Sequence, residues 1–149
     1  MTEGIALDQL RDELEVLGYD TVNCSDTIVG LSDDDGAIYF SLEHAEGWFH
    51  LRHPIEGDFS QPHLTNSLLL ANDRILGFRF SIDDEGWCFA VSDVLAEPDG
   101  VSNVIRTMEN MIEVVPYYVA QFAEIWASGK MVTGSDLDSI ADAIGGRSN

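Results

Sequence analysis

The chain has 149 residues, 45% of them hydrophobic, and its 27 acidic and 7 basic side chains give a formal charge of −20. This charge disfavours binding to nucleic acid or to an anionic membrane. No stretch approaches the roughly 20 apolar residues of a membrane span, and the N-terminus lacks the basic region of a signal peptide. With two cysteines and no disulfide framework, the composition predicts one cytoplasmic domain over residues 1–149, with a core of about 5–128 and a tail of 129–149.

The first predicted element is an amphipathic helix over residues 5–17. Leucines recur there at spacings of three, four and three, which places them along one face, while most charged residues occupy the other. Gly18 follows at the position of a C-terminal cap. The leucines of this stripe are Leu7, Leu10, Leu14 and Leu17.

Three strand-like runs come next, rich in β-branched and aromatic residues and separated by turns that contain glycine. They cover residues 27–31, 37–42 and 48–53, with a turn at Ala45-Glu46-Gly47 before the third. Pro54 predicts the end of the third strand, because proline lacks the N–H group that a central strand donates. The pattern predicts an antiparallel meander.

Residues 62–75 return to helical periodicity, and Pro62 suits the first turn of a helix. Leu69 and Leu70 lie outside the apolar stripe of this helix, so the helix is apolar on more than one side. Such a helix is buried on more than one side, either within the chain or against a second subunit. The stripe consists of Leu64, Leu68, Ala71 and Ile75.

A hairpin is predicted from strands over residues 78–82 and 87–91, around the acidic turn of IDDEGWCFAV (82–91). The stretch LSDDDGAIYF (31–40) has the same acid–glycine pattern. A calcium-binding EF-hand loop needs oxygen ligands at positions 1, 3, 5 and 12 and glycine at position 6. With Gly36 or Gly86 at position 6, both loops lack the glutamate at position 12. Asp and Gly suit tight hairpin turns, so we expect turns and no metal site.

The last and longest predicted element is a helix whose apolar stripe keeps its phase through Pro116. This predicts one kinked helix, or two nearly collinear ones, ending at Gly129. In the tail, Ser135 would cap a short helix from about Asp136. The stripe of the long helix consists of Val101, Ile105, Met108, Ile112, Val115, Val119, Phe122 and Trp126, and that of the short one consists of Leu137, Ile140 and Ile144.

The predicted order is α-β-β-β-α-β-β-α with a short C-terminal extension, which indicates an α+β fold in which helices flank an antiparallel sheet. The sequence has no nucleophile elbow, glycine-rich phosphate loop or HExxH motif. His50 and His53 would point to opposite faces of a strand, and Cys24 and Cys88 stand outside any CxxC pattern. We therefore expect neither an enzyme nor a cofactor.

In this order of elements, the stretch LLLANDRILGFRFSIDDEGWCFAVSD (68–93) resembles the class I chaperones of bacterial type III secretion, the Tir chaperone family. Those proteins also have a Leu-rich helix containing an Asn, then a strand, an acid–glycine turn and a second strand. The resemblance implies a homodimer that binds the N-terminal segment of a secreted virulence effector. It would keep that segment soluble and present it to the export machinery, with the secretion ATPase as a further partner, without using ATP.

The resemblance also implies positions for the two binding surfaces. The second helix and the following strand of the family build much of the dimer interface, and apolar patches on the sheet and first helix bind the client. The implied interface residues are Leu68, Leu69, Leu70, Ile75, Phe78 and Phe80. The implied client-binding residues are Ile28, Val29, Leu31, Ile38, Phe40 and Phe49.

Two other functions stay open at this point. The YbjN-like proteins are thought to share this fold, so the chain is also similar to a regulatory or adaptor protein without a secretion client. The strong negative charge also suits an acidic inhibitor or DNA mimic that occupies a basic site on another protein. The Leu-rich helix over 62–75 is not needed for that last role.

Overall fold

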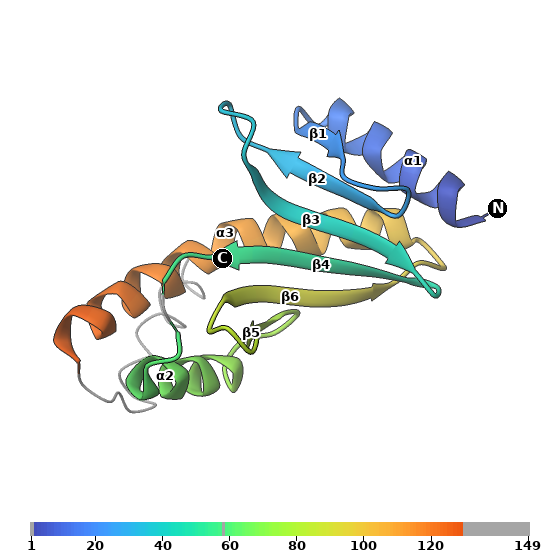
Figure 1. Ribbon diagram of the computed structural model, residues 1–149. Helices are drawn as coiled ribbons and strands as arrows, with labels where there is room; N and C mark the ends of the chain where they lie inside the picture. The colour runs from blue at the N-terminus through green and yellow to red at the C-terminus, as the bar shows by residue number, and fades with distance from the viewer. Residues whose placement is uncertain (1, 58, 130–149) are drawn as a thin grey trace, which may run out of the picture. The chain divides into compact units, whose positions relative to one another are not determined.

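The computed structural model describes residues 2–57 and 59–129, and it has an α+β fold in which helices flank a six-stranded antiparallel sheet (Figure 1). The strands are ordered β1-β2-β3-β4-β6-β5. The predicted fold class is therefore confirmed. The elements are α1 (Thr2–Val16), β1 (Asp20–Asn23), β2 (Ile28–Ser32), β3 (Ile38–Ala45), β4 (Trp48–Ile55), α2 (Pro62–Asn72), β5 (Arg79–Ile82), β6 (Cys88–Leu95) and α3 (Gly100–Ser128).

Strand β1 is the one element missing from the predicted order. It consists of Asp20-Thr21-Val22-Asn23, so it has a single apolar residue, and it pairs antiparallel with β2 at the border of the sheet. Most of its side chains are exposed. A short border strand whose side chains are mostly exposed shows no apolar alternation in its sequence.

By its contacts the chain divides into two compact units. The first unit comprises the chain up to Pro54 together with Val91–Glu109, and the second comprises Ile55–Ala90 together with the chain from Asn110 onward. The prediction of a single domain over residues 1–149 stays a prediction.

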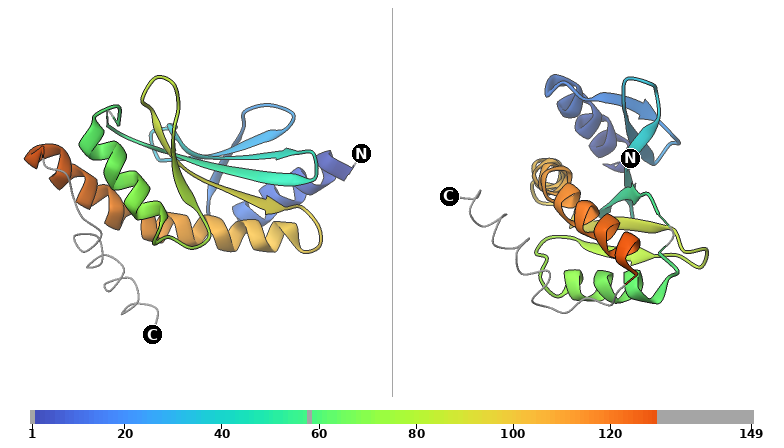
Figure 2. Two further views of the ribbon diagram at one scale, coloured as in Figure 1. Left: turned by 90° about the horizontal axis from the view of Figure 1, so that it is seen from below. Right: turned by 90° about the vertical axis from the view of Figure 1, so that its left-hand side faces the viewer.

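In the first unit, α1 packs on strands β1, β2 and β3 (Figure 2). Leu7, Leu10 and Leu14 are buried as their spacing predicted. Gly18 has a φ of 97° and caps the helix, with its N–H donating to the Glu15 carbonyl at 3.0 Å. Leu17 was predicted to belong to the buried stripe, and this is wrong: α1 ends at Val16, so Leu17 leaves the helical face and is exposed.

The two acid–glycine stretches are hairpin turns, as predicted. The Asp33 carboxylate accepts from the N–H groups of Asp35 at 3.0 Å and Ala37 at 2.9 Å. The Asp83 carboxylate repeats this pattern with Glu85 at 2.9 Å and Trp87 at 3.0 Å. In both turns the glycine takes a positive φ, 82° at Gly36 and 85° at Gly86, which glycine adopts at no steric cost. The first aspartate of each stretch therefore stabilises its own turn.

Strand β4 continues through Pro54 to Ile55, so the predicted end at Pro54 is wrong. The ladder between β3 and β4 runs from the pair Ala45–Trp48 to the pair Ser41–Arg52. Pro54 therefore lies past the last residue of β4 that pairs with β3, where its missing N–H costs no hydrogen bond to that strand.

In the second unit, Asn72 joins α2 to β5. Its side-chain amide donates to the Phe80 carbonyl at 3.0 Å, and its carbonyl oxygen accepts from the Phe80 N–H at 2.7 Å. The side chain thus pairs with a strand residue as a neighbouring backbone would. Helix α2 ends at Asn72, which leaves Ile75 outside the helix that was predicted to contain it.

The core of the second unit is aromatic. Phe80 meets Tyr118 with ring centroids 5.8 Å apart and Phe122 at 5.2 Å, and Phe59 meets Phe122 at 5.8 Å. The planes are steeply inclined in each pair, an arrangement that aromatic rings prefer. Burial raises the pKa of Tyr118 above its ordinary value, although nearby Arg74 acts in the opposite direction.

Helix α3 is one helix from Gly100 to Ser128, so the predicted continuity through Pro116 is confirmed (Figure 2). Pro116 is exposed, which leaves the carbonyl that loses its helical donor on the water side of the helix. Gly129, with a φ of 67°, ends the helix and donates to the Ile125 carbonyl at 2.9 Å. The helix predicted from about Asp136 lies outside the described residues.

The predicted buried stripe of α3 is wrong in half of its members. Apolar residues occur in adjacent pairs along this helix, for example Tyr118 with Val119 and Ile125 with Trp126. Neighbouring residues of a helix differ by roughly 100° around its axis. The sequence is therefore compatible with two orientations of the helix, one with the first member of each pair facing the core and one with the second. The structure buries Tyr118 and Ile125, and it leaves Val119 half-buried and Trp126 exposed. The buried side chains of α3 include Val104, Met108, Met111, Val115, Tyr118, Phe122 and Ile125.

Replacing Asn72 by alanine should lower the free energy of unfolding by about 1–3 kcal/mol, because both backbone groups of Phe80 lose their partner. Asp73→Ala, at the exposed neighbouring position, is the matched control and should change the free energy of unfolding by less than about 0.5 kcal/mol. Urea unfolding measures both values. Equal losses in the two variants would contradict the structural role given to Asn72.

Candidate binding grooves

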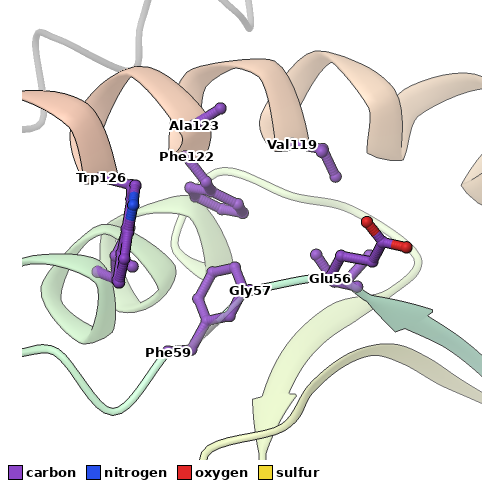
Figure 3. A pocket seen from close by; sticks show the side chains of 9 residues that line it. Glu56, Gly57, Phe59, Val119, Phe122, Ala123 and Trp126 are labelled. Atoms are coloured by element: carbon purple, nitrogen blue, oxygen red, sulfur yellow. The ribbon is translucent and has the colours of Figure 1, made fainter.

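The second unit contains an open groove with a cavity volume of about 380 Å³. Only one residue in the lining of this groove, Glu56, is charged. We therefore call this groove the apolar groove. Figure 3 shows the rings of Phe59 and Phe122 in its middle, with Trp126 at one end and Glu56 and Val119 at the other. The groove is lined by Ile55, Glu56, Gly57, Phe59, Leu64, Val119, Phe122, Ala123 and Trp126.

Helix α3 supplies one wall of the apolar groove. Val119, Phe122, Ala123 and Trp126 follow one another at helical spacing, and Trp126 keeps 51% of its surface exposed. Val119 and Trp126 belong to the half of the predicted stripe that the core does not cover. The second apolar face of α3 is therefore a groove wall.

The opposite wall requires glycine at position 57. Gly57 has a φ of 131°, and a Cβ there would lie 2.9 Å from Cε2 of Phe59, which is itself buried. Both the backbone conformation and the space therefore exclude a larger residue unless the Phe59 ring moves. The close approach of backbone and ring gives the groove its shape at this point.

His63 contacts Trp126 at one end of the apolar groove. Its imidazole stacks on the indole with centroids 6.4 Å apart and an angle of 28° between the planes. Its Nε2 is buried and has no hydrogen-bond partner among the described residues. The stacking holds Trp126 at the groove while leaving part of the indole exposed.

The first unit has a groove of different character, about 390 Å³ in volume, which we call the acidic groove. Val16, Leu17 and Ile105 give it an apolar floor, and Glu13 and Glu109 line it with negative charge. Val16 keeps 87% of its surface exposed. Ser102 completes the lining of this groove, which lies between α1 and the start of α3.

The thiols do not provide a reactive centre in either groove. Burial raises the pKa of the Cys88 thiol to about 12, which keeps this side chain protonated and unreactive at neutral pH. Cys24 is exposed, and its Sγ lies 3.9 Å from the Val22 carbonyl oxygen. Neither cysteine lines the apolar groove or the acidic groove.

The histidines of β4 are engaged in separate contacts. His50 Nδ1 lies 2.7 Å from the Asp93 carboxylate on β6, and His53 contacts the Tyr39 carbonyl and stacks on Phe40. Over residues 2–57 and 59–129, no group of three His, Cys, Asp or Glu side chains is placed to hold a metal ion. In the same part of the chain, no helix is both long and apolar enough to cross a membrane.

The structure gives the implied dimer-interface residues three different environments. Leu68, Phe78 and Phe80 are buried, Leu70 and Ile75 are half-buried, and Leu69 keeps 66% of its surface exposed. Leu76, which follows Ile75 in the chain and is not among the implied interface residues, is 89% exposed. Their role in an interface stays a prediction.

The implied client-binding residues are mostly inside the first unit. Val29, Leu31, Phe40 and Phe49 are buried, Ile28 is half-buried, and Ile38 is 40% exposed. The accessible surface of this set is therefore that of Ile38 and part of Ile28, and client binding there stays a prediction. Neither groove follows from the sequence alone, although the double apolar face of α3 is a signal for one.

No model of a known protein family matches the chain, and no curated protein matches it in sequence. Two solved structures share its fold. A chain of the HopA1–SchA chaperone–effector complex superposes with a TM-score of 0.58 at 16% identity, over 83% of this chain and 98% of that one. YbjN from E. coli, described as a proposed transcription regulator, superposes with a TM-score of 0.51 at 18% identity, over 85% of this chain and 96% of its own. The resemblance in fold is thus confirmed.

The buried thiol predicts a specific alkaline sensitivity. Cys88 has an ordinary pKa of 9.0 when unfolded and about 12 when folded, so its contribution to stability is complete below pH 9 and is lost as the pH rises towards 12. The loss should be about 1.4 kcal/mol per pH unit in that window. Comparing urea unfolding of the wild type and Cys88→Ala at pH 8 and pH 10 should show the gap between them shrinking by about that amount.

A labelling experiment provides the control. In the native chain at pH 8, Ellman's reagent should react with Cys24 and reach Cys88 only after denaturant is added. Rapid reaction of both thiols in the native chain would contradict the burial of Cys88.

Proposed function

We propose that this chain is a cytoplasmic chaperone-like protein that binds the N-terminal segment of a secreted effector and keeps it soluble and ready for export. The observation that carries the proposal is the apolar groove, an open apolar surface in a chain with a formal charge of −20. The fold shared with a chain of a chaperone–effector complex supports it. Delivery to the export machinery and its ATPase belongs to the same proposal.

The groove suits a client that has not folded. The exposed parts of Trp126, Ala123 and Val119 offer apolar contact, and Glu56 is the one charged side chain of the lining, so the groove selects little for the sequence of a client. An extended client can also gain affinity by pairing its backbone with a border strand; β1 borders this sheet, whereas the Phe80 backbone of β5 is already bonded to Asn72. Main-chain pairing and apolar contact each tolerate varied clients, as a chaperone requires.

The net charge supports the same role. Complexes of the chain with a client would repel one another, which would keep an apolar client dispersed while it is bound. Neither groove presents a cofactor site or a nucleophile with a base, so binding energy alone would hold the client. No ATP hydrolysis by the chain is part of this mechanism.

We also infer a homodimer that uses the exposed side of α2 and the turn after it. Leu69 and Leu76 are the most exposed leucines there, and Leu70 and Ile75 are half-buried. Exposed large apolar side chains grouped on one helix and its adjoining turn are typical of a surface that another protein covers. The buried members Leu68, Phe78 and Phe80 would support this surface from below.

The second candidate function is a regulatory or adaptor protein. It is favoured by the likeness to YbjN, which extends over 96% of that chain. An adaptor would bind a folded partner, whereas a chaperone binds a segment that remains non-globular. Protease sensitivity of the bound partner therefore separates the two functions.

The groove is tested by Ala123→Asp, which places a charge among apolar groove residues. Co-expressed effector N-terminal segments should co-purify with the wild type in protease-sensitive form, and Ala123→Asp should weaken this binding at least about tenfold. Ala120→Asp, on the same helix and exposed but outside the groove, is the matched control and should bind as the wild type does. Recovery of folded, protease-resistant partners alone would support the adaptor instead.

The dimer is tested by sedimentation equilibrium at micromolar concentration. The wild type should sediment as a dimer, and the double variant Leu69→Glu/Leu76→Glu as a monomer, because two charges would face each other across the interface. Leu95→Glu, an exposed leucine of the first unit, should leave the dimer intact. A wild-type monomer under these conditions would overturn the dimer.

A further inference from the structure

The apolar groove lies beside the point where the described chain ends. Ala123 and Trp126 line the groove, α3 ends at Ser128, and Gly129 turns the chain out of the helix with a φ of 67°. From Ala123 to Ser128 the helix rises only about 8 Å. Residues 130–149 therefore leave the described structure within one or two helical turns of an open apolar groove.

We propose that residues 136–144 of the same chain occupy the apolar groove when no client is bound. Leu137, Ile140 and Ile144 recur there at spacings of three and four, so a helix over these residues has one apolar face. Asp138 and Asp142 fall on the other side of such a helix. The segment thus has an apolar face for the groove and an acidic face for water.

The tether is long enough for this contact. Residues 129–135 connect α3 to the segment, and fully extended they span at most about 25 Å. The tether begins with Gly129 and ends with Gly134-Ser135, so neither of its ends has a β-branched residue. Since the groove wall includes Trp126, the segment needs to fold back over only the last turns of α3.

Charge favours this occupant over a basic peptide. The lining of the apolar groove has Glu56 as its single charged side chain, so a basic peptide would gain little there, and an acidic amphipathic segment meets little repulsion. The acidic groove, with Glu13 and Glu109, would repel residues 136–144. Because of this difference in charge, residues 136–144 suit the apolar groove and not the acidic groove.

Tethering makes a weak contact sufficient. A segment attached through a short linker has an effective concentration in the millimolar range at a nearby site. A client would then compete with the tail, and its apparent affinity would fall in proportion to the fraction of free groove. This regulatory consequence rests on the proposed function, whereas occupation of the groove by the tail does not.

The test uses the full chain and the indole N–H resonances of its three tryptophans, Trp48, Trp87 and Trp126. Trp126→Phe identifies the Trp126 resonance. The variant Leu137→Asp/Ile140→Asp should shift that resonance and leave those of Trp48 and Trp87 unchanged. Ser139→Asp/Ala143→Asp adds the same two charges away from the apolar face and should leave all three in place.

A dye titration gives a second measurement. The neutral apolar dye Nile red should bind Leu137→Asp/Ile140→Asp at least about tenfold more tightly than the wild type, because the groove is then free. Adding Ala123→Asp should abolish this gain. Equal dye affinity in the wild type and the tail variant would overturn the proposal.

An unmoved Trp126 resonance in Leu137→Asp/Ile140→Asp would also overturn it. A Trp126 shift that disappears when the wild type is diluted would mean that the tail of a second copy fills the groove, which overturns occupation by the same chain. No client enters either experiment, so these results are independent of whether effector segments co-purify with the protein.

Discussion

Helix α3 has more apolar surface than the core can cover. One part of this surface forms the interior, and the remainder forms a wall of the apolar groove. One face, with Met111, Tyr118 and Ile125, is buried, and the neighbouring face, with Val119 and Trp126, stays partly open. Burying the first face stabilises the fold through the hydrophobic effect. The second face remains partly exposed, and the strong negative charge opposes the self-association that exposed apolar surface favours.

The sequence predicted the features that depend on local chemistry. The turns at Asp33 and Asp83 follow from an aspartate that accepts backbone N–H groups and a glycine that tolerates positive φ. The continuity of α3 through Pro116 followed from the phase of its apolar residues. These arguments need only the neighbouring residues of the chain, which is why they succeeded along with the fold class.

The features that were missed depend on parts of the chain distant in sequence. In β2 the consecutive residues Val29, Gly30 and Leu31 are all buried, so no alternation shows which face a partner could reach. The groove residues Gly57 and Phe59 lie far from Val119 in sequence, and only the tertiary structure brings them together. The phase of α3 was ambiguous for a related reason, since either member of each apolar pair could face inward.

The pairing of Asn72 with Phe80 also has a consequence for recognition. Apolar packing alone lets a helix slide or rotate slightly over a strand, but two directional hydrogen bonds from one side chain fix α2 against β5. Leu69 lies one helical turn before Asn72, so its exposed side chain stands on a stiff support. A partner that docked on Leu69 would therefore meet a preorganised surface, and little further conformational entropy would be lost when the two associated.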